Sequence, residues 1–194
     1  MKELPRRLFH IFGGLSIPIA SLLIPQHIFL PALISIPIVF LILELVRLRF
    51  SPVNRRFLTC FHALLRENEV STLTASAYLL IAATIVFVFC DKAIAAMALT
   101  FVAVGDPIAG MVGERWGKLK IRGKSLEGSV ACLAACLMAG TILATIMHVA
   151  LWVVVLGAIC ATLVEFLSLP LNDNLIIPLV SGGVMTLVKF AVIV

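Results

Sequence analysis

Charged residues are scarce in this sequence of 194 residues: Asp, Glu, Lys and Arg make up 13% of it, against about 25% in soluble domains. Apolar residues reach 62%, where soluble domains have about 45–50%. These values exclude an ordinary water-soluble domain and indicate a polytopic membrane protein with one domain over residues 1–194. Because no small-residue cleavage site follows a short apolar stretch, we expect the first helix to be retained rather than removed as a signal peptide.

Cysteine patterns typical of metal sites are also missing. The five cysteines lie mostly within apolar runs, and none forms a CxxC pair or a Cys/His cluster with ligand spacing. We interpret them as small packing residues. The net charge of +5 does not predict binding to nucleic acid, because cations in a membrane protein first report its orientation.

Seven apolar segments approach the length of about 20 residues that one membrane crossing needs. They are 8–24, 28–48, 72–90, 93–113, 127–147, 149–167 and 175–194. The break at 49–71 has apolar residues at helical spacing between arginines, which predicts an amphipathic helix on the membrane surface. The sequence therefore predicts an all-α membrane bundle of about seven transmembrane helices, with one surface helix between the second and third spans.

The cations are distributed unevenly between the two predicted faces. Thirteen of the 15 Lys and Arg residues fall in the N-terminus and in the second and fourth loops with their helix ends, whereas Lys92 and Lys189 fall toward the opposite face. The positive-inside rule then predicts a cytoplasmic N-terminus and an external C-terminus. Six acids gather on the cytoplasmic face of this arrangement: Glu44, Glu69, Asp106, Glu127, Glu165 and Asp173. Acids near a membrane are costly, so this convergence predicts a functional site open to the cytoplasm.

The stretch GDPIAGMVGERWGKLKIRGKSLEGS, residues 105–129, leaves one apolar segment through a loop rich in Gly and Lys and enters another. It places Asp106 near the end of one helix and Glu127 in the first turn of the next. Ser125 can cap that second helix and leave its first amides free for phosphate oxygens. Five cations lie between the two acids: Arg115, Lys118, Lys120, Arg122 and Lys124. Mg²⁺ commonly takes carboxylates together with phosphates, so the stretch predicts a phosphate and metal site, although a solvated basic loop explains the cations alone.

Small residues recur every four positions in the same stretch, at Gly105, Ala109, Gly113 and Gly117. Such a row lets another helix approach closely. It explains helix packing without any further role, and it also permits a homodimer.

Further polar residues stand at predicted helix ends. Glu165 ends the sixth segment, where the negative end of the helix dipole disfavours a lone carboxylate, so we expect a metal, an arginine or water beside it. Asp173 and Asn174 precede the last segment, either as caps or as oxygen ligands. Glu44 and Arg47, three residues apart, predict an ion pair within the second segment.

Taken in order, these motifs resemble the polyprenol kinase family of CTP-dependent membrane lipid kinases, which includes dolichol kinase, phytol and farnesol kinases and the yeast-type diacylglycerol kinase. The matching motifs are RRLFH at residues 6–10, ELVR at 44–47, RENE at 66–69, GDPIAGMVGERWG followed by GKSLEGS, and Glu165 with NDNLIIP at 172–178. Each motif alone is weak, but their order and spacing over nearly the whole chain make the resemblance strong.

The resemblance implies phosphoryl transfer from CTP to the hydroxyl of a membrane lipid alcohol, either an isoprenoid alcohol such as phytol, farnesol, geranylgeraniol or a polyprenol, or diacylglycerol. It implies Mg²⁺ or Mn²⁺ as cofactor. It also implies a multi-pass protein of the prokaryotic plasma (inner) membrane with a cytoplasmic-facing site. The expected catalytic and metal-binding carboxylates are Asp106, Glu127 and Asp173, with Asn174 and Glu165 as further metal ligands. The expected nucleotide-binding residues are Gly105, Gly110, Lys120, Arg122, Gly123, Lys124 and Ser125. The expected supporting residues are Arg7, His10, Glu44, Arg47, Arg66 and Glu69.

Two other functions agree with parts of the pattern. A phosphatidate cytidylyltransferase would use similar metal chemistry but release pyrophosphate instead of CDP. A small ion transporter can also combine paired carboxylates with a proline-interrupted helix, but transport sites usually lie near the bilayer midplane. The acids here cluster at one predicted edge, which favours an enzyme.

Overall fold

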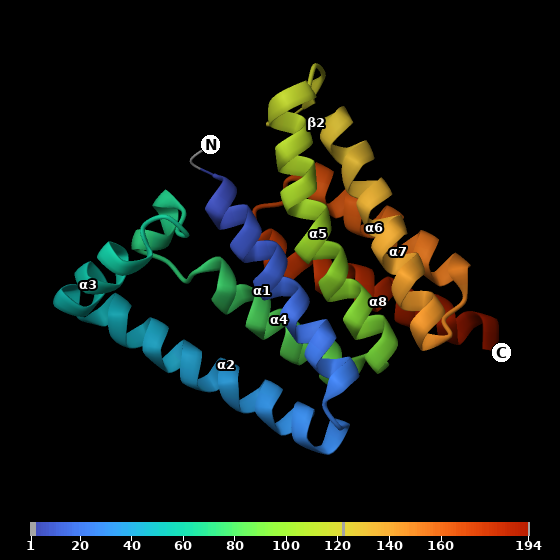
Figure 1. Cartoon of the computed structure of the whole chain (residues 1–194), viewed down its shortest axis with the longest axis horizontal. Coiled ribbons are helices and arrows are strands. Elements are labelled where there is room, and N and C mark those ends of the chain that lie inside the picture. The colour runs from blue at the N-terminus through green and yellow to red at the C-terminus, as the bar shows by residue number, and fades with distance from the viewer. Residues whose placement is uncertain (1–2, 122, 194) are drawn as a thin grey trace.

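The computed structural model describes residues 3–121 and 123–193 and is built almost entirely from helices (Figure 1). The helices are α1 (Leu4–Leu23), α2 (Gln26–Arg49), α3 (Ser51–Phe61), the 3₁₀ helix η1 (Glu67–Val70), α4 (Ala75–Phe89), α5 (Lys92–Trp116), α6 (Leu126–Met147), α7 (Leu151–Leu167) and α8 (Asp173–Ile193). Each of the seven apolar segments predicted from the sequence is a helix. The described residues also contain η1 and an antiparallel hairpin of β1 (Lys120–Ile121) and β2 (Lys124–Ser125) within the loop between α5 and α6, neither of which the sequence predicted.

The helix α5 lies at the centre of the bundle and contacts α1, α4, α6, α7 and α8 (Figure 1). All residues from Ile94 to Ala103 are buried. Small side chains make this close packing possible. A Cβ atom added to Gly14 of α1 would lie 2.6 Å from the Cβ atom of Ala103, which shows how closely α1 approaches the centre.

Among the described residues, four helices have the length and hydropathy to cross a membrane: α2, α5, α6 and the 173–191 part of α8. The helices α4 and α7 are apolar but shorter. The helix α2 packs chiefly on α4 and α3 and exposes a row of isoleucine, valine and leucine side chains along its length. Apolar surface of this extent is typical of contact with lipid. The fold is that of a multi-pass helical bundle, while the count of seven crossings and their direction stay predictions.

The predicted small-residue face of α5 is used for packing within the chain. A Cβ atom added to Gly105 would lie 2.9 Å from the Sγ atoms of Cys132 and Cys136 of α6. A Cβ atom added to Gly128 of α6 would lie 2.6 Å from the carbonyl oxygen of Ala109. Because α6 covers this face, nothing in the structure supports the homodimer that the same row of residues also permitted.

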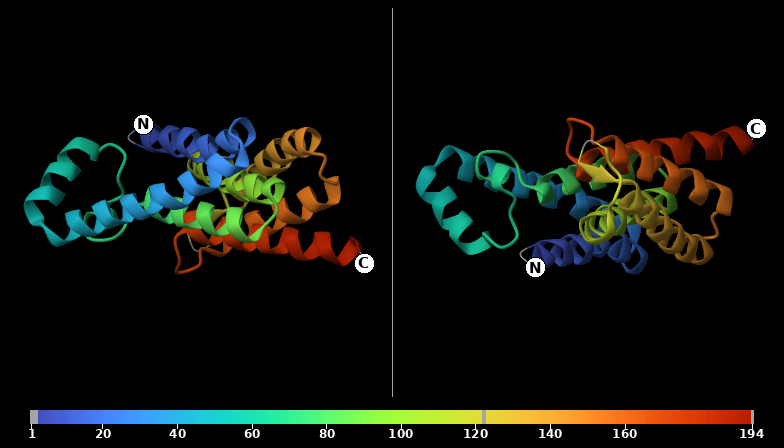
Figure 2. Two further views of the ribbon diagram at one scale, coloured as in Figure 1. Left: turned by 90° about the horizontal axis from the view of Figure 1, so that it is seen from below. Right: turned by 90° about the horizontal axis from the view of Figure 1, so that it is seen from above.

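The amphipathic segment is shorter than predicted. Its helix, α3, ends at Phe61, and residues 62–74 form turns and the single-turn η1. The helix and the turn after it project from one end of the bundle (Figure 2). In the segment after α3, Arg47 binds the carbonyl oxygens of Glu69 and Thr72 and so ties this segment to the end of α2.

Polar contacts join the helix ends that the sequence predicted to share one face. Arg7 at the start of α1 pairs with Glu114 at the end of α5. The Nδ2 atom of Asn174, at the start of α8, donates to the carbonyl of Ala75 at the start of α4, at 3.0 Å. At the other end of the bundle, Lys189 pairs with Asp91. Asp91 therefore lies at the end of the bundle opposite Glu114 and Asn174.

Candidate functional site

The ammonium group of Lys124 lies among three carboxylates from three different helices. Its Nζ atom is 2.5 Å from Glu165 Oε1 of α7, 3.5 Å from Asp173 Oδ2 of α8 and 3.9 Å from Asp106 Oδ1 of α5. The other oxygen of Asp106 is 3.9 Å from a guanidinium nitrogen of Arg66. We call Lys124, Asp106, Glu165 and Asp173 the Lys124 cluster.

The cluster is built by the ends of elements. Ser125 begins α6 as its cap, because its Oγ atom accepts from the backbone N–H of Gly128 at 3.0 Å, as the sequence predicted. This cap fixes the backbone next to Lys124. Asn172 caps α8 through its side-chain oxygen, which accepts from the N–H of Asn174 at 3.0 Å, and so positions Asp173. The turn of the hairpin contains Gly123, whose φ of +85° is a conformation that glycine adopts without strain.

The environment keeps Lys124 protonated. Burial by itself lowers the pKa of this ammonium group, but the negative charges of Asp106, Asp173 and Glu165 act against burial and prevail. The pKa is therefore raised from the usual value of 10.5. A positive charge at this position offsets part of the repulsion among three neighbouring carboxylates.

Two buried oxygen atoms, one of Glu165 in the cluster and one of Asn174, the residue after Asp173, have no hydrogen-bond partner. They are Glu165 Oε2 and Asn174 Oδ1, and both residues are almost fully buried, at 1% and 2% exposed. Buried polar atoms are normally paired, and oxygen atoms of carboxylates and amides are the ligands that Mg²⁺ and Mn²⁺ prefer. Among residues 3–121 and 123–193, however, no three His, Cys, Asp or Glu side chains are arranged to hold a metal ion as they stand. The carboxylate and amide oxygens are of the type that binds a divalent cation, whereas the distances between the carboxylates suit the ammonium group of Lys124.

Glu127 occupies a separate position. Its carboxylate is turned toward the backbone N–H groups of Lys118 and Leu119 in the loop before the hairpin. Its Oε2 atom is buried without a hydrogen-bond partner. The carboxylates that meet at Lys124 thus include Glu165, which the sequence predicted only as a further metal ligand. The role of Glu127 in metal binding stays a prediction.

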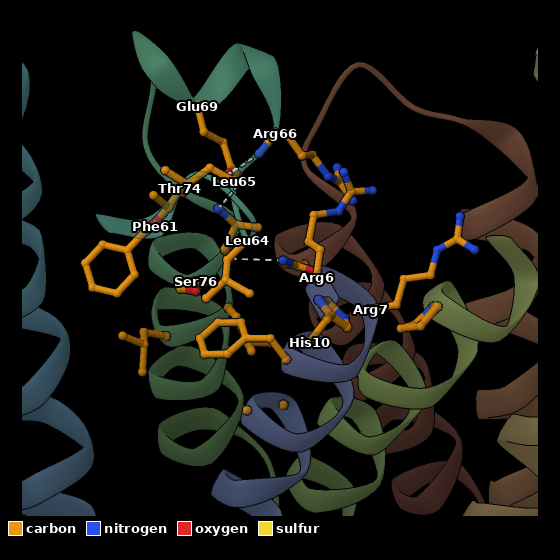
Figure 3. Close-up of a pocket in the computed structure, with 18 of the residues that line it drawn as sticks. Arg6, Arg7, His10, Phe61, Leu64, Leu65, Arg66, Glu69, Thr74 and Ser76 are labelled. Carbon is orange, nitrogen blue, oxygen red and sulfur yellow. Dashed lines mark hydrogen bonds between the residues drawn. The ribbon is translucent and has the colours of Figure 1, made fainter. Parts of the chain in front are cut away.

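A cavity of about 390 Å³ opens on the other side of Asp106. Its apolar wall comes from α1, α2, α3, the 62–74 segment and α4, and includes Phe9, Phe40, Phe57, Phe61, Leu64, Leu65, Leu79 and Leu80. Its polar wall includes Arg6, Arg7, His10, Arg66 and Asp106. Figure 3 shows Arg6, Arg7 and Arg66 together on one side and Phe61 on the opposite side. The cavity is therefore apolar over most of its surface and basic next to Asp106.

The helix α1 contributes two of the predicted supporting residues. Arg7 crosses the surface of Gly110, where an added Cβ atom would lie 3.3 Å from a guanidinium nitrogen, and reaches Glu114. Gly110 therefore makes room for Arg7. The Nε2 atom of His10 donates to the carbonyl of Val102 in α5 at 3.2 Å, so His10 joins the two helices beside the cavity.

Glu44 and Arg47 form the ion pair that their spacing predicted, and both are buried, at 2% exposed. Arg47 binds Glu44 through two hydrogen bonds of 3.1 and 2.8 Å. It also donates to Asn54 of α3 and to the carbonyls of Glu69 and Thr72. This pair therefore ties the end of α2 to α3 and to the segment after it.

Glu69 completes the connection to the site. Its carboxylate accepts from the backbone N–H of Arg66 at 3.0 Å and of Ala75 at 2.8 Å. The carboxylate of Glu44 accepts from the N–H of Thr74 at 3.0 Å. These bonds hold the segment that carries Arg66 over the cavity, so Glu44, Arg47 and Glu69 act on the site through backbone position.

Several predicted nucleotide-binding residues lie away from the cluster. Gly105 is buried against α6, and Lys120 is exposed on β1. Arg122 lies outside the described residues. The sequence did not reveal that Lys124 is surrounded by carboxylates, or that Arg6 and the phenylalanines of α1 and α3 share a cavity. The only signal was the motif RRLFH, in which Arg6 precedes Arg7.

The sequence is similar to CTP-dependent diacylglycerol kinase 1 of Saccharomyces cerevisiae, with 29% identity over 133 residues that make up 66% of this chain and 46% of the yeast protein. The chain thus spans about half the length of that relative. It is also similar to an uncharacterized protein of Rickettsia prowazekii, with 25% identity over 185 residues, covering 91% of this chain and 90% of the rickettsial one. No protein-family profile matches the sequence. No solved structure matches it either.

Proposed function

We propose that this protein transfers the terminal phosphoryl group of CTP to the hydroxyl group of a membrane lipid alcohol. The position of Asp106 carries this proposal. Its side chain lines the cavity of about 390 Å³, and its Oδ1 atom is 3.9 Å from Nζ of Lys124. A lipid hydroxyl in the cavity and a triphosphate beside Lys124 would therefore meet at one carboxylate. The similarity to the yeast kinase supports CTP as donor and a lipid as acceptor.

The two walls of the cavity suit the two parts of such an acceptor. The phenylalanine and leucine side chains of the apolar wall would hold the hydrocarbon, because burial of apolar surface is favourable by about 25 cal/mol per Å². Arg6, Arg7 and Arg66 would stand beside the transferred group, where guanidinium ions bind phosphate oxygens well. Lys120, Arg122 and Lys124, with the amides at the start of α6, would hold the nucleotide phosphates.

In the reaction, the hydroxyl oxygen of the lipid forms a bond to the γ-phosphorus of CTP, and the bond from this phosphorus to the β–γ bridging oxygen breaks. Asp106 accepts the hydroxyl proton, as a general base in contact with the acceptor. The products are the lipid phosphate and CDP. The cations lower the barrier by neutralising charge on the phosphate oxygens, which is the main task in phosphoryl transfer.

Asp173, Glu165 and Asn174 are the residues that would hold a divalent cation, and Asp106 would join them if it binds the ion instead of accepting the proton. When bound, Mg²⁺ or Mn²⁺ supplies charge neutralisation on the nucleotide phosphates. The spare buried oxygens of Glu165 and Asn174 support this assignment. Glu127 would bind the same ion only through a shift of its side chain away from the 118–119 loop.

The test is an assay of the purified protein with labelled CTP and a panel of acceptors: farnesol, geranylgeraniol, phytol, undecaprenol and diacylglycerol. We expect a labelled lipid phosphate and stoichiometric CDP. The variant Asp106→Asn should lower the rate by about 10²–10⁴-fold, the usual contribution of a general base. Asp91→Asn is the matched control, because Asp91 pairs with Lys189 at the opposite end of the bundle.

Each alternative gives a different result in this assay. Release of pyrophosphate with a cytidylated lipid would instead indicate a cytidylyltransferase. Retained turnover in Asp106→Asn, with unchanged folding, would remove Asp106 from the reaction. No transfer to any acceptor would refute the proposed function.

A further inference from the structure

We propose that the ammonium group of Lys124 and a divalent cation compete for the same carboxylates, so that Lys124 is a resident cation displaced when metal and nucleotide bind. The identity of the metal's partner, a nucleoside triphosphate, rests on the proposed function. The competition itself rests on the geometry of the Lys124 cluster. Lys124 thereby opposes the binding of metal alone and becomes a ligand of phosphate once it is displaced.

The distances within the cluster are those of an ammonium ion. The three carboxylates lie 2.5, 3.5 and 3.9 Å from Nζ of Lys124. Mg²⁺ requires oxygen atoms at about 2.0–2.1 Å in a near-octahedral arrangement. The carboxylates must therefore move closer together when a metal ion replaces the ammonium group. The space between them holds either the ammonium group or the metal ion, but not both.

Two unpaired oxygen atoms, one in the cluster and one in the residue after Asp173, provide more binding capacity than Lys124 uses. The Oε2 atom of Glu165 and the Oδ1 atom of Asn174 are buried and have no hydrogen-bond partner, although Glu165 touches Lys124 through its other oxygen. An ammonium group donates three hydrogen bonds at most. A six-coordinate ion would use the additional oxygens, which an ammonium leaves unpaired.

The position of Lys124 in the chain allows its side chain to leave. It stands in a two-residue strand next to the hairpin turn, with 26% of its side chain exposed. A Cβ atom at Gly123 would meet nothing within 4 Å, so the turn is open on that side. The next residue, Ser125, is held as the cap of α6. The flexible side chain can therefore move toward a bound triphosphate while the backbone stays in place.

The competition predicts a coupling between metal and nucleotide. A metal ion that binds alone must displace Lys124 into solvent. A metal ion that binds with a triphosphate offers the ammonium new anionic partners. Each ligand should therefore increase the affinity of the other, as reciprocal coupling requires.

The experiment measures Mn²⁺ binding by electron paramagnetic resonance, with the full-length protein in nanodiscs and no nucleotide. Lys124→Met removes the competing charge and should tighten Mn²⁺ binding by about tenfold or more, given the charge interactions of a partly buried pair at this distance. Lys124→Arg keeps the charge and should remain close to wild type. Lys189→Met is the matched control and should not change Mn²⁺ affinity, because Lys189 pairs with Asp91 at the far end. Unchanged or weaker binding in Lys124→Met, or no Mn²⁺ binding by either protein, overturns the proposal.

A second measurement uses the wild-type protein and decides the matter if Lys124→Met does not fold. Amine acetylation, followed by mass spectrometry, reports how accessible Lys124 is relative to Lys189. Saturating Mn²⁺ should increase acetylation of Lys124 and leave Lys189 unchanged, whereas equal acetylation with and without Mn²⁺ refutes displacement. Neither measurement requires turnover, so the competition can stand when the acceptor assay fails and can fail when that assay succeeds.

Discussion

The pair of Glu44 and Arg47 gives the sharpest prediction about stability. Replacing Arg47 by Met removes a guanidinium group that makes two hydrogen bonds to Glu44 and three to Asn54, Glu69 and Thr72. Both charged side chains are 3% exposed, so the substitution leaves the Glu44 carboxylate buried without its counter-ion. Loss of one partner from a buried pair costs about 3–5 kcal/mol. The same substitution also frees the segment that carries Arg66.

Thermal unfolding in detergent or nanodiscs measures this cost. A change of 1 kcal/mol shifts Tm by about 2–4 °C in a chain of this size, so Arg47→Met should lower Tm by roughly 6–20 °C. Lys189→Met breaks an exposed pair with Asp91 and should cost about 1 kcal/mol or less. The double variant Glu44→Gln with Arg47→Met should recover part of the loss, because no uncompensated charge remains. A Tm for Arg47→Met equal to that of Lys189→Met, or strictly additive losses in the double variant, would refute the buried-pair reasoning.

Three further predictions concern packing, the cavity and the metal. Gly128→Ala should destabilise the protein by about 1–3 kcal/mol, the usual cost of overpacking, because the new Cβ atom would lie 2.6 Å from the carbonyl oxygen of Ala109. The control, Gly183→Ala, has nothing within 4 Å of its Cβ atom and should be neutral or stabilising in the same unfolding assay. Gly13 lines the cavity and has open space around its Cβ position, so Gly13→Leu adds volume there. We expect this variant to raise the KM for the lipid acceptor and to leave the KM for CTP unchanged. The control variant Gly183→Leu should change neither KM. With nucleotide present, Glu165→Gln should weaken Mn²⁺ binding more than Glu127→Gln does, because Glu165 contacts Lys124 whereas Glu127 faces the 118–119 loop. Equal losses of Mn²⁺ affinity in the two variants would place Glu127 in the metal site.

The sequence was sufficient to predict the helices because apolar runs of this length leave few alternatives. Caps also were readable: Ser125 lies at the start of α6 as expected. The position of the 69–72 segment was not predictable, since it depends on Arg47, which comes earlier in the chain and binds the carbonyl groups of Glu69 and Thr72. A local pattern carries no information about a side chain that arrives from another helix.

For the candidate site, the sequence indicated which residue types gather but not which residues touch. Asp106 and Asp173 were expected together, and both lie beside Lys124. That Glu165 and not Glu127 contacts Lys124 was not predictable, because it depends on which way the first turn of α6 faces. Ser125 caps that turn and sets its direction, and the 118–119 backbone then receives the Glu127 carboxylate.

The connections from α2 to the site suggest why polar residues so far apart share one region. Arg47 fixes the carbonyls of residues 69 and 72, and Glu69 fixes the N–H groups of Arg66 and Ala75. The carbonyl of Ala75 in turn binds Asn174, the residue after Asp173. One chain of hydrogen bonds therefore runs from the end of α2 to Arg66 and Asn174, which line the cavity together with Asp106. Because buried networks of this kind are costly when partly broken, we expect that breaking these contacts would disturb both the cavity beside Asp106 and the carboxylates that we propose to bind a cation.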